Sequence, residues 1–198
     1  MLIDSSSAIT LSIIGLEHLS ENLSIVPQIQ GELDDSSRFR IYEVTKEELD
    51  TLINNLEIIS KQINKQIYIE ITKTQRYSKI CLLNPLGAKG KFSIHYGELY
   101  LLAKCVSLSE ELLCEDEDAY NILELLSGIC RIQVKPISTI EFLYRNFLSG
   151  ELSAIEFIES IKLLESSKRL YFRFPAKSRR DRYAIDTLYK FMQHLVQG

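Results

Sequence analysis

The chain has 198 residues, of which 45% are hydrophobic and 25% charged, with a net charge of −4 and only eight glycines and four prolines. This composition is typical of a folded globular protein and excludes a disordered or fibrous one. A chain of this length forms one medium-sized domain or two small ones.

The N-terminal region lacks the features of an export signal or a membrane span. Arg38 is its first basic residue, and six acidic residues precede it, whereas a secretory signal places positive charge ahead of an apolar stretch. The most apolar early stretch, residues 8–16, contains two polar residues and a glycine. It is far shorter than the roughly 20 residues that a span needs. We therefore expect a soluble, cytoplasmic protein with no membrane partner.

The four cysteines, Cys81, Cys105, Cys114 and Cys130, do not have the spacing of metal ligands. None forms a CxxC pair, and no histidine stands at a zinc-ligand distance from them in the sequence. Three lie in apolar stretches, where a free cysteine packs as a small hydrophobic residue. We expect four reduced thiols and no metal, cofactor or catalytic residue among them.

Elements of the N-terminal half are predicted from hydrophobic periodicity and turn residues. Thr45 and Glu48 have the spacing of a capping box, which marks a helix start. The strands on either side of that helix, at 39–44 and 67–72, are expected to be parallel neighbours. In chain order we predict a strand at 9–14, a short helix at 16–23, a strand at 39–44, a helix at 46–64, strands at 67–72, 77–83 and 91–96 with a hairpin between the last two, and a helix from 97 to about 113.

Two further capping boxes, Ser138 with Glu141 and Ser153 with Glu156, predict a pair of helices in the C-terminal half. A glycine at 128 is expected to end the helix before them. In chain order we predict a helix at 119–127, a strand at 131–135 ended by Pro136, helices beginning after Ser138 and Ser153, a strand at 170–174, and a helix at about 182–196.

Together these elements predict an α+β fold. Residues 1–114 are expected to form a mixed sheet with two amphipathic helices. Residues 115–198 are expected to be mainly helical, with one or two short strands. The boundary is an acidic connection rather than a Gly-rich or Pro-rich linker, so tight packing as a single domain remains open.

The acidic connection is the run Glu115 to Asp118. Carboxylates at a helix start are stabilised by the positive end of the helix dipole, and we interpret the run in this way. The same residue types bind Mg²⁺ or Ca²⁺, but the run lacks the spacing of a calcium-binding loop. If the protein is an enzyme with a metal site, Glu70 and this run are the best carboxylate candidates.

Charge is distributed unevenly along the chain. Residues 168–198 carry eight basic and two acidic residues, a charge of +6, whereas residues 1–167 carry 15 basic and 25 acidic residues, a charge of −10. Basic residues interleaved with aromatic ones suit contacts with phosphates and bases. The candidate residues for binding nucleic acid or a protein partner are Lys168, Arg169, Arg173, Lys177, Arg179, Arg180 and Arg182.

Residues 147–157 resemble a helix junction of the colicin-type immunity proteins, a helical family. The opposed charges of the two parts of the chain can steer a partner protein. No catalytic constellation is recognisable, and the three histidines lie far apart. We therefore hypothesise a non-enzymatic protein–protein interaction module of the inhibitor, adaptor or immunity type. The alternatives are a nucleic-acid-binding regulator that uses residues 168–182, and an enzyme whose site is assembled from distant residues.

Overall fold

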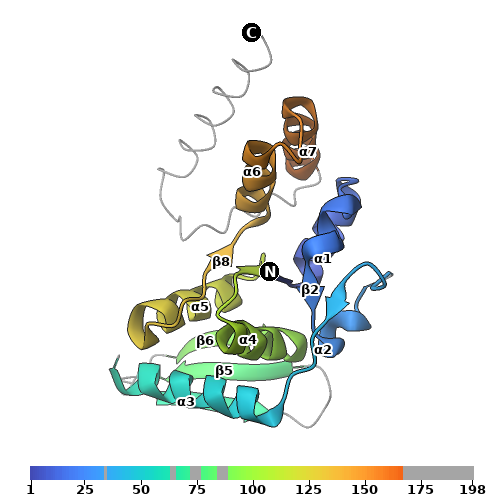
Figure 1. Cartoon of the computed structure of the whole chain (residues 1–198). Helices are drawn as coiled ribbons and strands as arrows, with labels where there is room; N and C mark the ends of the chain where they lie inside the picture. Colours follow the sequence, from blue (N-terminus) through green and yellow to red (C-terminus); the bar gives the residue numbers. More distant parts are fainter. Residues whose placement is uncertain (34, 63–65, 72–76, 84–88, 167–198) are drawn as a thin grey trace.

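The computed structural model describes residues 1–33, 35–62, 66–71, 77–83 and 89–166 (Figure 1). It confirms a mixed helix and strand fold that is mostly helical. The single mixed sheet predicted for residues 1–114 is wrong, because the structure has two separate sheets, one parallel and one antiparallel, and the parallel one includes a strand at 136–137. The strands are β1 (Leu2–Ile3), β2 (Ser24–Ile25), β3 (Arg40–Ile41), β4 (Gln66–Ile71), β5 (Tyr77–Leu83), β6 (Lys89–His95), β7 (Leu112–Leu113) and β8 (Pro136–Ile137). The helices are α1 (Ser5–Ile13), the 3-10 helix η1 (Glu17–Asn22), α2 (Pro27–Gln30), α3 (Lys46–Gln62), α4 (Tyr96–Leu108), α5 (Glu117–Cys130), α6 (Thr139–Ser149) and α7 (Ala154–Ser166).

The central sheet is parallel and has the strand order β3-β2-β1-β7-β8. On one side of β1 lie β2 and then β3. On its other side lie β7 and then β8. Each strand is only two residues long, yet backbone bonds fix the register, such as Asp4 N to Leu113 O at 3.0 Å and Cys114 N to Ile137 O at 3.1 Å.

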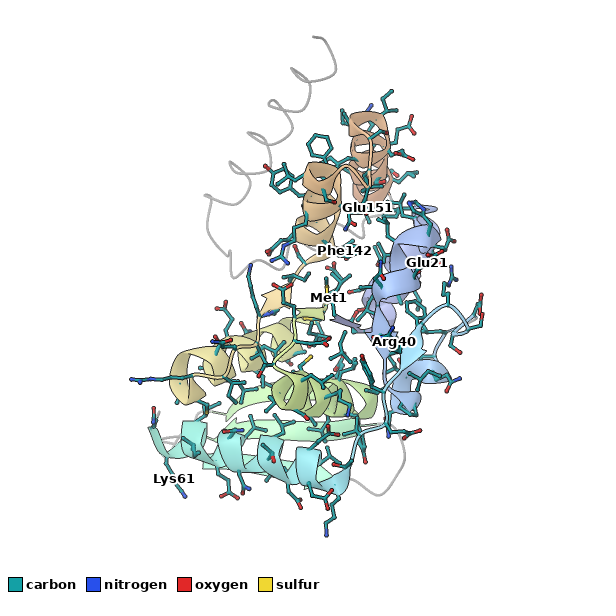
Figure 2. All side chains as sticks on the ribbon, viewed as in Figure 1. Met1, Glu21, Arg40, Lys61, Phe142 and Glu151 are labelled. Atoms are coloured by element: carbon teal, nitrogen blue, oxygen red, sulfur yellow. The ribbon has the colours of Figure 1, made fainter. Side chains whose placement is uncertain are left out.

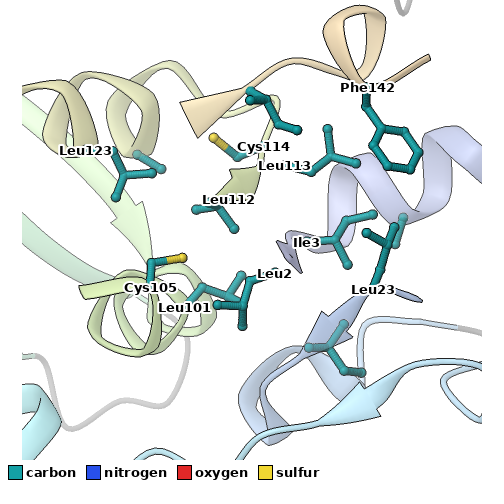
Figure 3. Packing of buried hydrophobic residues seen from close by; sticks show 14 of the residues in the cluster. Leu2, Ile3, Leu23, Leu101, Cys105, Leu112, Leu113, Cys114, Leu123 and Phe142 are labelled. Atoms are coloured by element: carbon teal, nitrogen blue, oxygen red, sulfur yellow. The ribbon is translucent and has the colours of Figure 1, made fainter. Parts of the chain in front are cut away.

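The inner strands β1 and β7 of the central sheet are wholly apolar and buried, because helices cover both faces of the sheet at this point. Successive side chains of a strand point to opposite faces. Leu2 of β1 lies on the side of α4, close to Leu101 and Cys105, while Ile3 lies on the opposite side, toward Phe142 of α6 (Figure 3). Both strand residues are fully buried. The helices α4 and α6 therefore cover opposite faces of the same strand.

The second sheet is an antiparallel meander in the order β4-β5-β6. It packs with α3, α4 and α5 at the end of the molecule away from α6 and α7 (Figure 1). The predicted hairpin between residues 77–83 and 91–96 is confirmed, although its turn at 84–88 lies outside the described residues. The predicted parallel pairing of 39–44 with 67–72 is wrong. β3 pairs with β2, and β4 pairs with β5.

Two predicted capping boxes are confirmed, because in each of them both residues donate a backbone hydrogen bond to the side chain of the other. Thr45 N donates to Glu48 Oε2 at 2.8 Å while Glu48 N donates to Thr45 Oγ1 at 3.2 Å. Ser153 and Glu156 repeat this pair with the same two distances. Each pair satisfies backbone donors that a helix start leaves without intrahelical partners. The predicted helices at 46–64 and after Ser153 begin where these residues place them.

The predicted strand at 9–14 is wrong, because residues 5–13 form α1. Asp4 caps this helix through a bond from Ser7 N to its Oδ1 at 2.7 Å. The buried residues Ser7, Ala8 and Leu11 recur every three to four positions, which is the spacing of one helix face. A helix cap therefore overrides the apparent alternation of apolar and polar residues.

Three predicted boundaries in the second half also need correction. α5 continues past Gly128 to Cys130 and ends where Arg131 adopts a left-handed φ of 56°. The predicted strand at 131–135 is displaced, because β8 is Pro136–Ile137. The helix predicted to reach about residue 113 ends at Leu108, and β7 follows it.

The predicted boundary between residues 114 and 115 stays a prediction. β7, just before it, pairs with β8, which follows it. The predicted strand at 170–174 and helix at 182–196 lie outside the described residues. Among the helices of the described residues, none has both the length and the apolar character needed to cross a membrane.

Candidate functional site

The carboxyl ends of β1 and β7 meet at the point where the order of the central sheet reverses direction. The chain leaves β1 at Asp4 toward β2, and it leaves β7 at Cys114 toward β8. Connections that diverge from two adjacent parallel strands leave a crevice outside their carboxyl ends, where open α/β sheets bind their ligands. The side chains at this edge are therefore the candidates for a functional site.

Asp4 is the central side chain of this edge. It is only 2% exposed, and its carboxylate accepts three hydrogen bonds: from Ser7 N at 2.7 Å, from Ser6 Oγ at 2.9 Å and from Glu115 N at 3.2 Å. The last bond joins the loop after β1 to the loop after β7. Asp4 therefore joins the two connections that leave the carboxyl ends of β1 and β7.

Burial raises the pKa of Asp4 above its ordinary value of 3.8. Hydrogen bonds from Ser7, Ser6 and the Glu115 amide favour the charged form, but the loss of hydration outweighs them. A charged carboxylate without a cation is costly in such a place. A bound cation would offset this cost and favour the ionised form of Asp4.

The acidic run after β7 contributes two more carboxylates, and both act at helix starts. Glu115 Oε1 accepts a hydrogen bond from Thr139 N, at the start of α6, at 3.0 Å. Asp116 Oδ1 accepts from Asp118 N at 2.8 Å and from Ala119 N at 2.9 Å, at the start of α5. The starts of α1, α5 and α6 are thus linked through these carboxylates at one edge of the sheet. Helix starts carry partial positive charge and bind anionic groups, phosphates included.

Glu32 extends the acidic edge toward β2 and α2. Ser5 Oγ, in the first turn of α1, donates to Glu32 Oε2 at 2.5 Å. The Glu32 side chain is otherwise exposed to solvent. The edge therefore combines a buried carboxylate, two half-buried ones and an exposed one.

No group of three or more His, Cys, Asp or Glu side chains in the described part of the chain is arranged to hold a metal ion. This argues against a zinc or calcium cage within those residues. It does not address Mg²⁺, which proteins usually hold through one or two carboxylates together with waters and substrate phosphates.

The structure brings together only some of the site residues that the sequence predicted. Glu115 and Asp116 of the acidic run lie at the edge, and Asp118 lies in the first turn of α5. Glu70 lies in β4, with its side chain outside the described residues, as is the side chain at 117. The predicted binding residues Lys168, Arg169, Arg173, Lys177, Arg179, Arg180 and Arg182 all lie outside the described residues.

Sequence reasoning missed Asp4 and Glu32. A local signal for Asp4 was present: an aspartate directly after two apolar residues and before three serines is a typical helix cap. Nothing local marks it as a site residue, because that role depends on β7 lying beside β1. Glu32 carries no comparable signal.

The predicted packing role is confirmed for the buried cysteines. Cys105 is fully buried, Cys114 is 2% exposed, and both are free thiols. Burial raises the pKa of each thiol, so neither is a thiolate at neutral pH. Cys130 is half-buried, and burial raises its pKa as well.

Comparison of the chain with protein families, with curated proteins and with solved structures finds no match.

Proposed function

We propose that the protein is a magnesium-dependent hydrolase of phosphodiesters whose substrate is a nucleic acid strand. The observation that carries this proposal is the position of buried Asp4 at the carboxyl end of β1, beside the carboxyl end of β7, where the sheet order reverses. Open parallel sheets bind ligands at this position irrespective of their reaction.

The side chains at the edge suit a metal and a phosphate together. Asp4 and Glu115 provide carboxylate oxygens for Mg²⁺, and the starts of α1, α5 and α6 provide positive partial charge for phosphate oxygens. Asp4 and Glu115 would hold the ion, and a bound Mg²⁺ would supply activation of a water and would offset the charge that develops on the phosphate oxygens. The net reaction consumes one water: one P–O ester bond breaks, the hydroxyl joins phosphorus, and the proton goes to the released oxygen.

The basic C-terminal segment supports a polymeric substrate. Residues 168–198 carry a charge of +6 in a protein whose net charge is −4. Phosphate contacts of Lys and Arg supply most of the non-specific affinity for nucleic acids. We propose that Arg179 and Arg180 bind substrate phosphates. This proposal combines the two alternatives that the sequence offers beside an interaction module, namely a nucleic-acid-binding protein and an enzyme.

The test is cleavage of end-labelled single-stranded RNA and DNA with and without 5 mM Mg²⁺, comparing wild type with Asp4→Asn. We expect metal-dependent cleavage by wild type, abolished by chelation and reduced about 100-fold or more in the variant. Asp50→Asn, an exposed carboxylate of α3, is the matched control and keeps full activity. Figure 2 shows Lys61, near the end of the same helix, well away from Met1, which precedes β1. Absence of cleavage with Mg²⁺ and Mn²⁺, in protein shown to be folded, contradicts the proposal.

An interaction module is the second candidate function, and one surface favours it. Leu148 and Ile155 on the α6–α7 pair are 63% and 61% exposed, and Leu163 of α7 is 46% exposed. Exposed apolar side chains that cluster on one helix pair are a typical protein contact surface. We expect a stable partner to co-purify with the tagged chain from its native host and to be lost with Leu148→Ser and Ile155→Ser. Isolation of the wild type as a lone monomer at low salt contradicts this candidate.

A further inference from the structure

A cavity of about 230 Å³ lies between the outer face of α1 and the segment 31–39. It exceeds the roughly 150 Å³ that holds a benzene ring and approaches the lower end of small-molecule sites, about 300 Å³. It is open to solvent on one side. The residues that line it are Ala8, Ile9, Ser12, Ile13, Leu33, Asp35, Arg38 and Phe39.

The segment 31–39 that forms one side of this groove is bonded to α1 at two places. Two side-chain bonds cross from α1 to the segment 31–39: Ser5 Oγ to Glu32 at the edge, and Arg38 Nη2 to Ser12 Oγ at 3.3 Å further along. Ser5 and Ser12 are about two turns apart, which is roughly 10 Å along the helix axis. The bond of Ser5 at the acidic edge and the bond of Ser12 in the groove therefore lie along the same helix, about two turns apart.

The groove combines one cation with an apolar wall. The Arg38 guanidinium carbon lies 6.0 Å from the centre of the Phe39 ring, and its Nε is buried with no hydrogen-bond partner among the described residues. A buried donor without an acceptor is unfavourable, so an oxygen ligand that draws the side chain toward the groove would relieve it. Ile9 and Ile13, beside it, are 37% and 45% exposed, which is unusual for isoleucine.

We propose that this groove is a subsite for the nucleotide adjacent to the scissile phosphate, an inference that rests on the proposed hydrolase function. Arg38 binds the phosphate of that nucleotide through its planar guanidinium, as arginine does in phosphate recognition. Ile9 and Ile13 pack against its base, which has an apolar face whatever its sequence. Arg38 is thus a positioning and binding residue for the strand.

Asp35 makes the subsite selective for a nucleotide over a free anion. Its Oδ1 accepts hydrogen bonds from Ser37 N at 2.9 Å and Ser37 Oγ at 2.7 Å, and these bonds lower its pKa. Asp35 therefore stays negative beside Arg38 at neutral pH. Because its charge partly offsets that of Arg38, phosphate binds firmly only when an attached base adds the isoleucine contacts.

The experiment compares two phosphodiesters in the presence of Mg²⁺. Bis(p-nitrophenyl) phosphate has no second phosphate, whereas a single-stranded ten-nucleotide oligomer fills both the acidic edge and the groove. We expect Arg38→Gln to raise KM for the oligomer about tenfold, to leave kcat unchanged, and to leave hydrolysis of the small diester unchanged. Arg40→Gln, which removes an exposed arginine of β3, is the matched control and leaves both substrates unaffected.

A second variant, Ile13→Ser, changes an exposed side chain and is expected to fold; it should raise KM for the oligomer only. Equal effects of Arg38→Gln on both substrates, or no effect on either, overturn the subsite. If wild type hydrolyses neither substrate, the proposed hydrolase function fails separately. In that case, fluorescence anisotropy of the labelled oligomer at 50 and 200 mM salt tests the subsite through binding alone. A loss of affinity for the oligomer in Arg38→Gln supports the subsite, and an unchanged affinity overturns it.

Discussion

Replacing Asp4 with alanine tests whether this residue joins the two loops of the carboxyl edge or only caps α1. Loss of a helix cap costs about 1 kcal/mol, at most about 2 kcal/mol. Asp4→Ala also leaves Glu115 N without its acceptor, which was bonded at 3.2 Å, and an unsatisfied part-buried donor costs about 1 to 3 kcal/mol. Removal of a buried carboxylate recovers part of its desolvation. We expect a net loss of about 3 kcal/mol at pH 7.

The matched control is Asp116→Ala, because Asp116 also caps a helix through two backbone amides but is only half-buried. Its expected cost is that of a cap alone, about 1 kcal/mol. Asp4→Ser restores a cap without the link to Glu115, so it should recover only about 1 kcal/mol of the loss. The free energy of unfolding is measured by urea denaturation followed by circular dichroism. If Asp4→Ala and Asp116→Ala lie within about 0.5 kcal/mol of each other, Asp4 is only a helix cap.

Three other predictions follow from packing and titration. Gly97→Ala should lower the free energy of unfolding by about 1 to 3 kcal/mol, because its new Cβ would lie 2.2 Å from Ile29 Cγ2. Gly128→Ala has open space around it and should raise the free energy of unfolding by up to about 1 kcal/mol; urea denaturation measures both. The raised pKa of Asp4 means that the folded state binds the proton more tightly than the unfolded state does. The stability of wild type relative to Asp4→Asn should therefore fall as pH rises from about 3.8 through the raised pKa, and no change over that window contradicts the assignment. Cys105, fully buried, should react with a thiol reagent only after denaturation, as mass spectrometry of the labelled peptide can show.

Local chemistry in the sequence located the helix starts that carry a capping box. The reciprocal bonds of Thr45 with Glu48 and of Ser153 with Glu156 involve residues three positions apart, so their geometry does not depend on the rest of the fold. The strands 66–71 and 77–83 were also predictable as strands, because six or seven residues suffice to display a strand pattern, but their antiparallel pairing with each other was not predicted.

The central sheet could not be predicted in the same way. Its strands are two residues long, so a segment such as Leu2–Ile3 or Leu112–Leu113 offers no alternation to detect. Their pairing spans more than 100 residues of the chain. The site at Asp4 and Glu115 depends on that pairing, because the two residues are neighbours only when β1 lies beside β7.

A proton and a divalent cation compete for Asp4, and this competition connects its burial with the proposed function. Burial raises the pKa of Asp4, so the empty site favours the protonated form more than an exposed aspartate would. A cation with two positive charges offsets the same desolvation and displaces the proton. At a pH near the raised pKa of Asp4, binding of Mg²⁺ should therefore release protons from wild type but not from Asp4→Asn. Because an ordinary surface carboxylate with a pKa near 4 is more fully ionised at that pH, the difference in proton release between wild type and Asp4→Asn would identify the buried aspartate as the metal ligand.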